Sequence, residues 1–99
     1  MIKKTIFTQE APKPVGPYSQ AVISNGLIFL AGQIAINPET GVMHSEGVHK
    51  DVRQIFANID AVLKASGSSV ENILKLTVYL VDLNDVKFVN EVIEEIFGG

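Results

Sequence analysis

The sequence predicts a single α+β domain, residues 1–99, in which two helices cover one face of a β-sheet. Three observations predict this class. An Asn25-Gly26 pair separates two short apolar runs, which is the strongest local signal for a β-hairpin. Apolar residues then recur at helical spacing twice, from Val48 and from Val86. A chain of 99 residues that is 46% apolar and 19% charged can close one core and is too short for a second domain.

The first part of the chain is predicted to be β-structure interrupted by a proline-rich loop. Residues 4–8 are a short strand candidate, and residues 19–24 and 27–31 are the two strands of the hairpin. A type I′ turn between them requires positive φ at both central residues, which Asn and Gly tolerate. Three prolines within residues 12–17 exclude a helix there. A turn cluster at residues 37–41 ends the apolar run that follows the hairpin.

The second part of the chain is predicted to contain two helices with a strand between them. The first helix ends before Gly67, and its apolar face consists of Val48, Val52, Ile55, Phe56, Ile59, Val62 and Leu63. Residues 73–81 alternate apolar and polar side chains, which is typical of a strand. Asn84 or Asp85 is expected to cap the second helix, whose apolar residues are Val86, Val89, Ile93, Ile96 and Phe97.

Charge and composition exclude several classes of function. The net charge of −3 and the pI near 5.2 leave little attraction for a phosphate backbone, so we expect no nucleic-acid partner. The chain has no cysteine and therefore no disulfide or thiolate nucleophile. No apolar run has the length of a membrane helix, and no signal peptide follows Met1. We expect a cytoplasmic protein without a membrane partner.

The histidines and the acidic run of the second helix are expected to be surface residues. His44 and His49 lack a third ligand at metal-binding spacing, so we expect no metal. Glu91, Glu94 and Glu95 lie away from the apolar residues of their helix, as a solvated face does.

Tyr18, Gly32 and Asn90 are the residues that local sequence singles out for binding. A proline turn delivers Tyr18 to the start of a strand, where its ring suits a binding wall or merely seals the sheet edge. Gly32, next to Ala31, either permits close approach of a ligand or marks a β-bulge. Asn90 departs from the apolar spacing of its helix, as a surface residue or an interface residue does.

Several motifs in order resemble the RidA (YjgF-type) reactive-intermediate deaminase family, also known as L-PSP endoribonucleases. They include Gly-Pro-Tyr-Ser-Gln-Ala at residues 16–21, Leu-Ala-Gly-Gln-Ile at 30–34, Asn-Pro-Glu-Thr-Gly at 37–41, Lys-Leu-Thr-Val-Tyr-Leu at 75–80 and Val-Asn-Glu-Val at 89–92. The resemblance implies a chorismate-mutase-like fold with a mixed β-sheet packed on two helices. It also implies a homotrimer with ligand clefts between subunits. The family continues with two strands after the second helix, so we expect this domain to be C-terminally shortened, with those strands missing.

The activity implied by the resemblance is hydrolysis of 2-iminobutanoate, 2-iminopropanoate and similar imino or enamine acids to 2-oxo acids and ammonia, without a cofactor. The residues that match the family's substrate-binding cleft are Tyr18, Ala31, Gly32 and Asn90. The catalytic residues stay unknown, because the family's arginine and carboxylate belong to Pro-Ala-Arg and Ile-Glu-Ile-like segments that this sequence does not contain. In the family, the resemblance implies, that arginine binds the substrate carboxylate. Arg53, the single arginine of this sequence, lies away from the apolar face of its helix and is not expected to take over this role.

Three functions remain open from the sequence. The first is a RidA-type imine deaminase acting on a small imino or 2-oxo acid ligand. The second is a non-catalytic trimeric member that binds ligands or acts as a chaperone. The third is an endoribonuclease or translation inhibitor, against which the acidic pI and single arginine argue.

Overall fold

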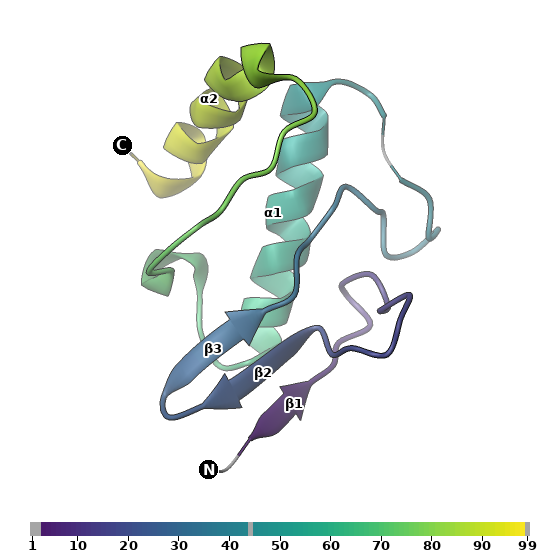
Figure 1. Cartoon of the computed structure of the whole chain (residues 1–99), viewed down its shortest axis with the longest axis vertical. Coiled ribbons are helices and arrows are strands. Elements are labelled where there is room, and N and C mark those ends of the chain that lie inside the picture. The colour runs from purple at the N-terminus through teal and green to yellow at the C-terminus, as the bar shows by residue number, and fades with distance from the viewer. Residues whose placement is uncertain (1–2, 44, 99) are drawn as a thin grey trace.

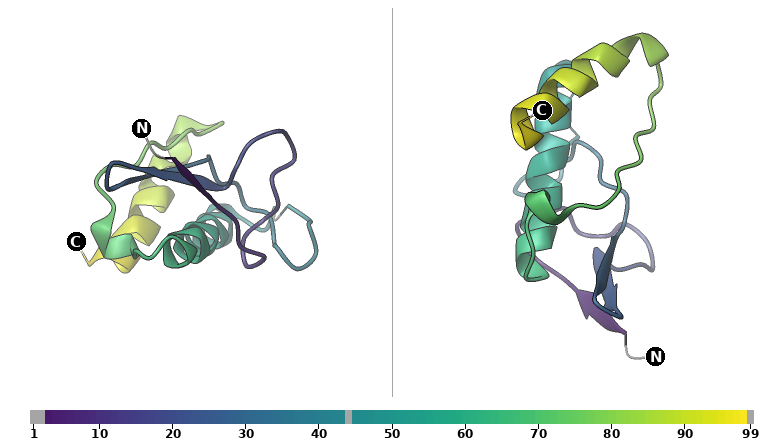
Figure 2. Two further views of the ribbon diagram at one scale, coloured as in Figure 1. Left: turned by 90° about the horizontal axis from the view of Figure 1, so that it is seen from below. Right: turned by 90° about the vertical axis from the view of Figure 1, so that its left-hand side faces the viewer.

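The computed structural model of the chain describes residues 3–43 and 45–98. Helices form one layer, and strands together with extended chain form the other (Figures 1 and 2). The elements in order are β1 (Lys4–Ile6), β2 (Ala21–Ser24), β3 (Leu27–Leu30), α1 (Val48–Ala65), the short 3₁₀ turns η1 (Val70–Asn72) and η2 (Leu83–Asp85), and α2 (Val86–Phe97). The α+β class predicted from the sequence is confirmed.

The three strands form an antiparallel sheet in the order β1-β2-β3. Asn25 and Gly26 have φ angles of 52° and 75°, which is the left-handed backbone that the hairpin turn requires. The predicted hairpin is therefore confirmed, with strands slightly shorter than expected. The turn at residues 37–41 is also present, closed by the Gly41 amide donating to the Asn37 carbonyl at 2.8 Å.

Helix α1 begins one residue after Gly47 and lies against both the sheet and α2 (Figure 1). Its buried residues are Val52, Phe56, Asn58, Val62 and Leu63. Gly67, with φ of 82°, follows the end of the helix as predicted. The amphipathic pattern is thus confirmed, except that it overlooked the burial of an asparagine.

Helix α2 follows η2, and its N-cap is one of the two residues proposed from the sequence. Asp85 occupies the N-cap position but makes no side-chain capping bond. Instead, Asp82 accepts a hydrogen bond from the Asn84 amide at 2.9 Å and so closes η2. The predicted cap position at Asp85 is therefore confirmed, but the expected side-chain capping bond is absent, and the side-chain bond of this region closes the Asx turn at Asp82 instead.

Two small hydrophobic clusters hold the layers together. Ile6, Ala11, Ala21 and Val62 fill the space between the sheet and the lower half of α1. Val52, Phe56, Val89 and Val92 join α1 to α2, where the Phe56 and Phe97 rings meet edge to face with centroids 5.8 Å apart. Neither helix in the described part of the chain is long and apolar enough to cross a membrane.

Residues 73–81 differ from the sequence expectation. Ile73 and Asp82, at the two ends of this segment, have extended backbone angles, and Figure 2 shows the segment in the layer of the strands. Within residues 3–43 and 45–98, however, it pairs with no strand, so the paired sheet is antiparallel rather than mixed. The prediction of a strand at residues 73–81 is therefore wrong for the described chain, because a strand needs a hydrogen-bonded neighbour and no described segment supplies one.

Candidate functional site

A surface hollow of about 180 Å³ brings together the proline-rich loop and the chain that leaves β3. Residues 12–15 and Tyr18 form one wall, and residues 32–34 with Ile36 form the other. We call this the Tyr18 hollow. Two of the residues singled out from the sequence, Tyr18 and Gly32, therefore lie in one site although they are 14 positions apart in the chain.

Local backbone geometry fixes the position of Tyr18. Its amide donates to the Gly16 carbonyl at 2.8 Å, which closes a tight turn immediately before the ring. A side chain at Gly16 would meet the Tyr18 ring at 3.4 Å, so the ring lies close over this glycine. Tyr18 is 54% exposed and therefore does not seal a sheet edge. The exposed part of its side chain contributes to the lining of the hollow.

A buried glutamine holds the proline-rich wall in place. Gln20 is 2% exposed, and its Oε1 accepts from the Thr8 amide at 2.6 Å. Its Nε2 donates to the carbonyls of Thr8 at 3.0 Å, Ala11 at 3.4 Å and Pro12 at 3.0 Å. One side chain thus replaces the secondary structure that the prolines prevent and satisfies the polar groups of the loop.

A buried asparagine does the same for the opposite wall. Asn58 of α1 is 1% exposed and donates from Nδ2 to the carbonyls of Ile34 at 3.1 Å and Ile36 at 3.0 Å. Its Oδ1 accepts from Gln54 Nε2 at 2.9 Å. The irregular chain after β3 is therefore tied to the helix layer at Ile34 and Ile36, two of the residues that line the hollow.

Gly32 is open to solvent at the centre of this second wall. A Cβ added there would meet no atom within 4 Å, and Gly32 is not among the residues with positive φ. It also lies beyond the end of β3, so a β-bulge does not explain it. Neither strain nor packing within the described chain requires a glycine here, which favours the reading that the position accommodates close approach of a ligand.

The hollow offers hydrogen-bond donors and one positive charge. The amides of Gly32, Gln33 and Ile34 donate to no acceptor in residues 3–43 and 45–98. Ala31, next to them, is bound on both sides: its amide donates to the Gln20 carbonyl at 3.0 Å, and its carbonyl accepts from Gln33 Nε2 at 3.3 Å. Lys13 is the cationic side chain of the lining, and no Asp or Glu lines the hollow in the described chain.

Asn90 is not brought into this hollow. It is an exposed residue of α2, which packs at the other end of α1 from the sheet (Figure 1). Of the residues proposed for the binding cleft, Tyr18 and Gly32 line the hollow, and Ala31 precedes Gly32 in the chain without lining it. Local sequence did not single out Lys13, Gln20 or Asn58. The signal for Asn58 was present, since it lies three residues after Ile55 and four before Val62 on the apolar face.

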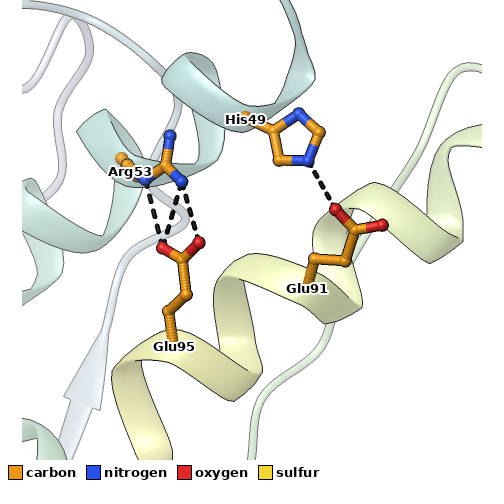
Figure 3. A network of polar contacts seen from close by, with 4 residues as sticks. All are labelled: His49, Arg53, Glu91 and Glu95. Atoms are coloured by element: carbon orange, nitrogen blue, oxygen red, sulfur yellow. Dashed lines mark hydrogen bonds and ion pairs between the residues drawn. The ribbon is translucent and has the colours of Figure 1, made fainter.

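The surface histidine and the single arginine form a separate polar network between α1 and α2 (Figure 3). His49 Nε2 lies 2.8 Å from Glu91 Oε2, and Arg53 Nη2 donates to both Glu95 oxygens at 2.9 and 3.0 Å. Arg53 also borders a shallow depression of about 390 Å³ with Phe56 and Ile96. The guanidinium is thus paired with Glu95, and Arg53 is not among the residues that line the Tyr18 hollow. It does not bind a ligand carboxylate there.

Glu91, Glu94 and Glu95 are exposed, as expected, although two of them pair with α1. His44 lies outside the described residues. Elsewhere in the described chain, no three His, Asp or Glu side chains gather in a way that could hold a metal ion.

Comparison with known proteins identifies the family. The family described as Endoribonuclease L-PSP matches residues 8–99. A RutC family protein of Pyrococcus abyssi is 48% identical over 98 residues, which are 99% of this chain and 77% of that protein. The 2-iminobutanoate/2-iminopropanoate deaminase of Homo sapiens is 40% identical over 98% of this chain and 71% of its own length.

A solved structure shows the same likeness in three dimensions. The crystal structure of E. coli TdcF with bound serine superposes with a TM-score of 0.91 at 40% identity, covering 96% of this chain and 74% of TdcF. Together, the sequence match over nearly the whole chain and the agreement in fold show that this chain belongs to the endoribonuclease L-PSP family, to which the RidA and RutC proteins also belong.

Proposed function

We propose that this protein hydrolyses small 2-imino acids, and their enamine tautomers, to 2-oxo acids and ammonia. Water adds to the imine carbon, and the resulting tetrahedral carbinolamine releases ammonia as the carbonyl forms. The observation that carries the proposal is that Tyr18 and Gly32 face one hollow in a chain 40% identical to a human 2-iminobutanoate/2-iminopropanoate deaminase. The bound serine of TdcF supports a ligand of this size with a carboxylate on C1.

The chemistry of the hollow suits such a ligand. The Tyr18 hydroxyl can donate to or accept from the imine nitrogen or the attacking water. The amides of Gly32 and Gln33 are donors without an intramolecular partner in the described chain, and they suit an anionic oxygen. The apolar side chains of Val15, Ile34 and Ile36 line the remainder and suit a short alkyl group.

We propose further that the active assembly is a homotrimer with the ligand between subunits. The Tyr18 hollow is open on one side, and Asn90 is exposed on a different element. In such an assembly Asn90 approaches the hollow of a neighbouring copy and contributes a hydrogen bond at the interface. Analytical ultracentrifugation of the wild-type chain and of Asn90→Ala measures the assembly directly.

The proposal is tested in a coupled assay in which an amino-acid dehydratase generates 2-iminobutanoate and release of 2-oxobutanoate is followed. The protein is expected to accelerate release, and Tyr18→Phe is expected to lower kcat/KM by roughly tenfold, the effect of one lost hydrogen bond of about 1.4 kcal/mol. Tyr79→Phe is the matched control, since Tyr79 is 91% exposed and outside the hollow. Equal rates with and without the protein contradict the proposal.

A second candidate function is a non-catalytic module that binds the same class of ligand. It is favoured by the absence of any carboxylate among the described residues that line the hollow, because a general base normally orients the attacking water. The two candidates differ in one measurement: a binding module takes up 2-oxobutanoate without accelerating its release from the imine.

A further inference from the structure

We propose that Lys13 is the cationic group that binds the carboxylate of the ligand in the Tyr18 hollow. This inference rests on the proposed function for the identity of the ligand, a small 2-oxo or 2-imino acid. Neither the sequence pattern nor the family resemblance singled out this lysine. It follows from where the folded chain places it.

The charges around the hollow point to Lys13. It is the cation of a lining that contains no carboxylate in the described chain, whereas the chain as a whole carries a net charge of −3. An anionic ligand is therefore repelled by the molecule in general and attracted at this position. Arg53 cannot serve instead, because both oxygens of Glu95 occupy its guanidinium.

The ammonium group of Lys13 is also available. It makes no ion pair with residues 3–43 or 45–98, whereas Lys50 and Lys64 each pair with a carboxylate four residues away. The same lining contains Gly32, Gln33 and Ile34, whose unpaired amides supply further donors. A carboxylate between the two walls is thus able to accept from the ammonium on one side and from backbone amides on the other.

The backbone of Lys13 is held rigidly for this task. Pro12 and Pro14 fix their own φ angles on either side of it and restrict the residues that precede them. The Pro12 carbonyl is bound by Gln20 Nε2 at 3.0 Å, which anchors the loop to the start of β2. Only the side chain of Lys13 remains to be ordered on binding, so less conformational entropy is lost than for a lysine on a mobile loop.

The test compares a charged ligand with an uncharged one. Wild type, Lys13→Met and Lys13→Arg are titrated with 2-oxobutanoate and with 2-oxobutanamide by calorimetry, and Lys3→Met is the control because Lys3 is exposed and outside the hollow. Lys13→Met is expected to weaken 2-oxobutanoate binding by about tenfold and to leave 2-oxobutanamide binding unchanged. Lys13→Arg and Lys3→Met are expected to bind 2-oxobutanoate within about threefold of wild type.

The outcomes separate this inference from the proposed function. Unchanged 2-oxobutanoate affinity in Lys13→Met, or an equal loss for the amide and the acid, overturns the role of Lys13 even if the wild type hydrolyses the imine. No binding of 2-oxobutanoate to the wild type overturns it as well. Binding that depends on the Lys13 charge, without any acceleration of imine hydrolysis, supports Lys13 and contradicts the deaminase.

Discussion

Replacing Gln20 by leucine is expected to destabilise the whole domain although the volume of the side chain is nearly kept. Gln20 is 2% exposed and binds both the amide and the carbonyl of Thr8, together with the carbonyl of Pro12, at 2.6 to 3.0 Å. The contact with Ala11 is longer, at 3.4 Å, and adds little. Leucine leaves all of these backbone groups without a partner in a partly buried loop.

The magnitude follows from the number of good hydrogen bonds. At about 1 kcal/mol of net stability for each of the three shorter bonds, the free energy of unfolding falls by about 3 kcal/mol. This is a large share of the roughly 5 to 15 kcal/mol that stabilises a typical domain. Backbone groups left without a partner make the loss in free energy of unfolding larger, and water that enters the opened loop makes it smaller.

Urea unfolding followed by far-UV circular dichroism measures the change. Gln20→Leu is expected to shift the midpoint strongly while the slope against urea stays constant. Gln33→Leu is the matched control, because Gln33 makes a single side-chain bond at 3.3 Å to a carbonyl two residues away and is expected to change stability by less than about 0.5 kcal/mol. Hydrogen exchange at the Thr8 amide supplies a local readout, with faster exchange expected in Gln20→Leu. A Gln20→Leu protein as stable as Gln33→Leu, with the Thr8 amide still protected, would refute the reasoning.

Three further predictions follow from other contacts. Gly32→Ala should keep the free energy of unfolding within about 0.5 kcal/mol yet weaken 2-oxobutanoate binding in calorimetry; a loss of stability instead assigns Gly32 to the fold. A double-mutant cycle on Arg53 and Glu95, by urea unfolding, should give a coupling of about 0.5 to 1 kcal/mol that shrinks in high salt, because both side chains are half exposed. A coupling insensitive to salt contradicts this. The Glu71 carboxylate accepts hydrogen bonds from the Glu71 backbone amide and from the Ser69 hydroxyl, and these lower the pKa of Glu71 below 4.5. The stability that the ionised Glu71 contributes is therefore complete above pH 4.5 and is lost as the pH falls through the lowered pKa. An NMR titration should show this, and a Ser69→Ala protein with an equally low Glu71 pKa would argue against the hydroxyl.

Short-range sequence patterns were sufficient for most of the helices and the hairpin. The Asn25-Gly26 turn needs only its own backbone preference, and α1 needs only an apolar face at the right period. The strand prediction for residues 73–81 shows the limit of short-range patterns. Alternation of apolar and polar residues favours an extended backbone, but the hydrogen bonds of a β-sheet also need a neighbouring strand in register. That neighbour depends on the whole fold.

The candidate site was predictable only in part for a related reason. Tyr18 and Gly32 stand out locally, one by its proline turn and the other as a glycine after a strand. Gln20, Asn58 and Lys13 gain their roles from chain segments that are distant in sequence. An asparagine or glutamine within an apolar sequence pattern indicates a buried side-chain hydrogen bond, but the pattern does not show which loop will be the partner.

The unpaired segment 73–81 also affects how the protein behaves in concentrated solution. Leu74, Tyr79 and Val81 are exposed beside backbone donors and acceptors that no described strand satisfies, and such an edge attracts the same edge of another molecule. Lys75 is the positive charge that interrupts this apolar surface and opposes stacking of identical segments. Further charges in residues 73–81, none of which lines the Tyr18 hollow, are therefore expected to lower self-association of the described chain without changing the binding site.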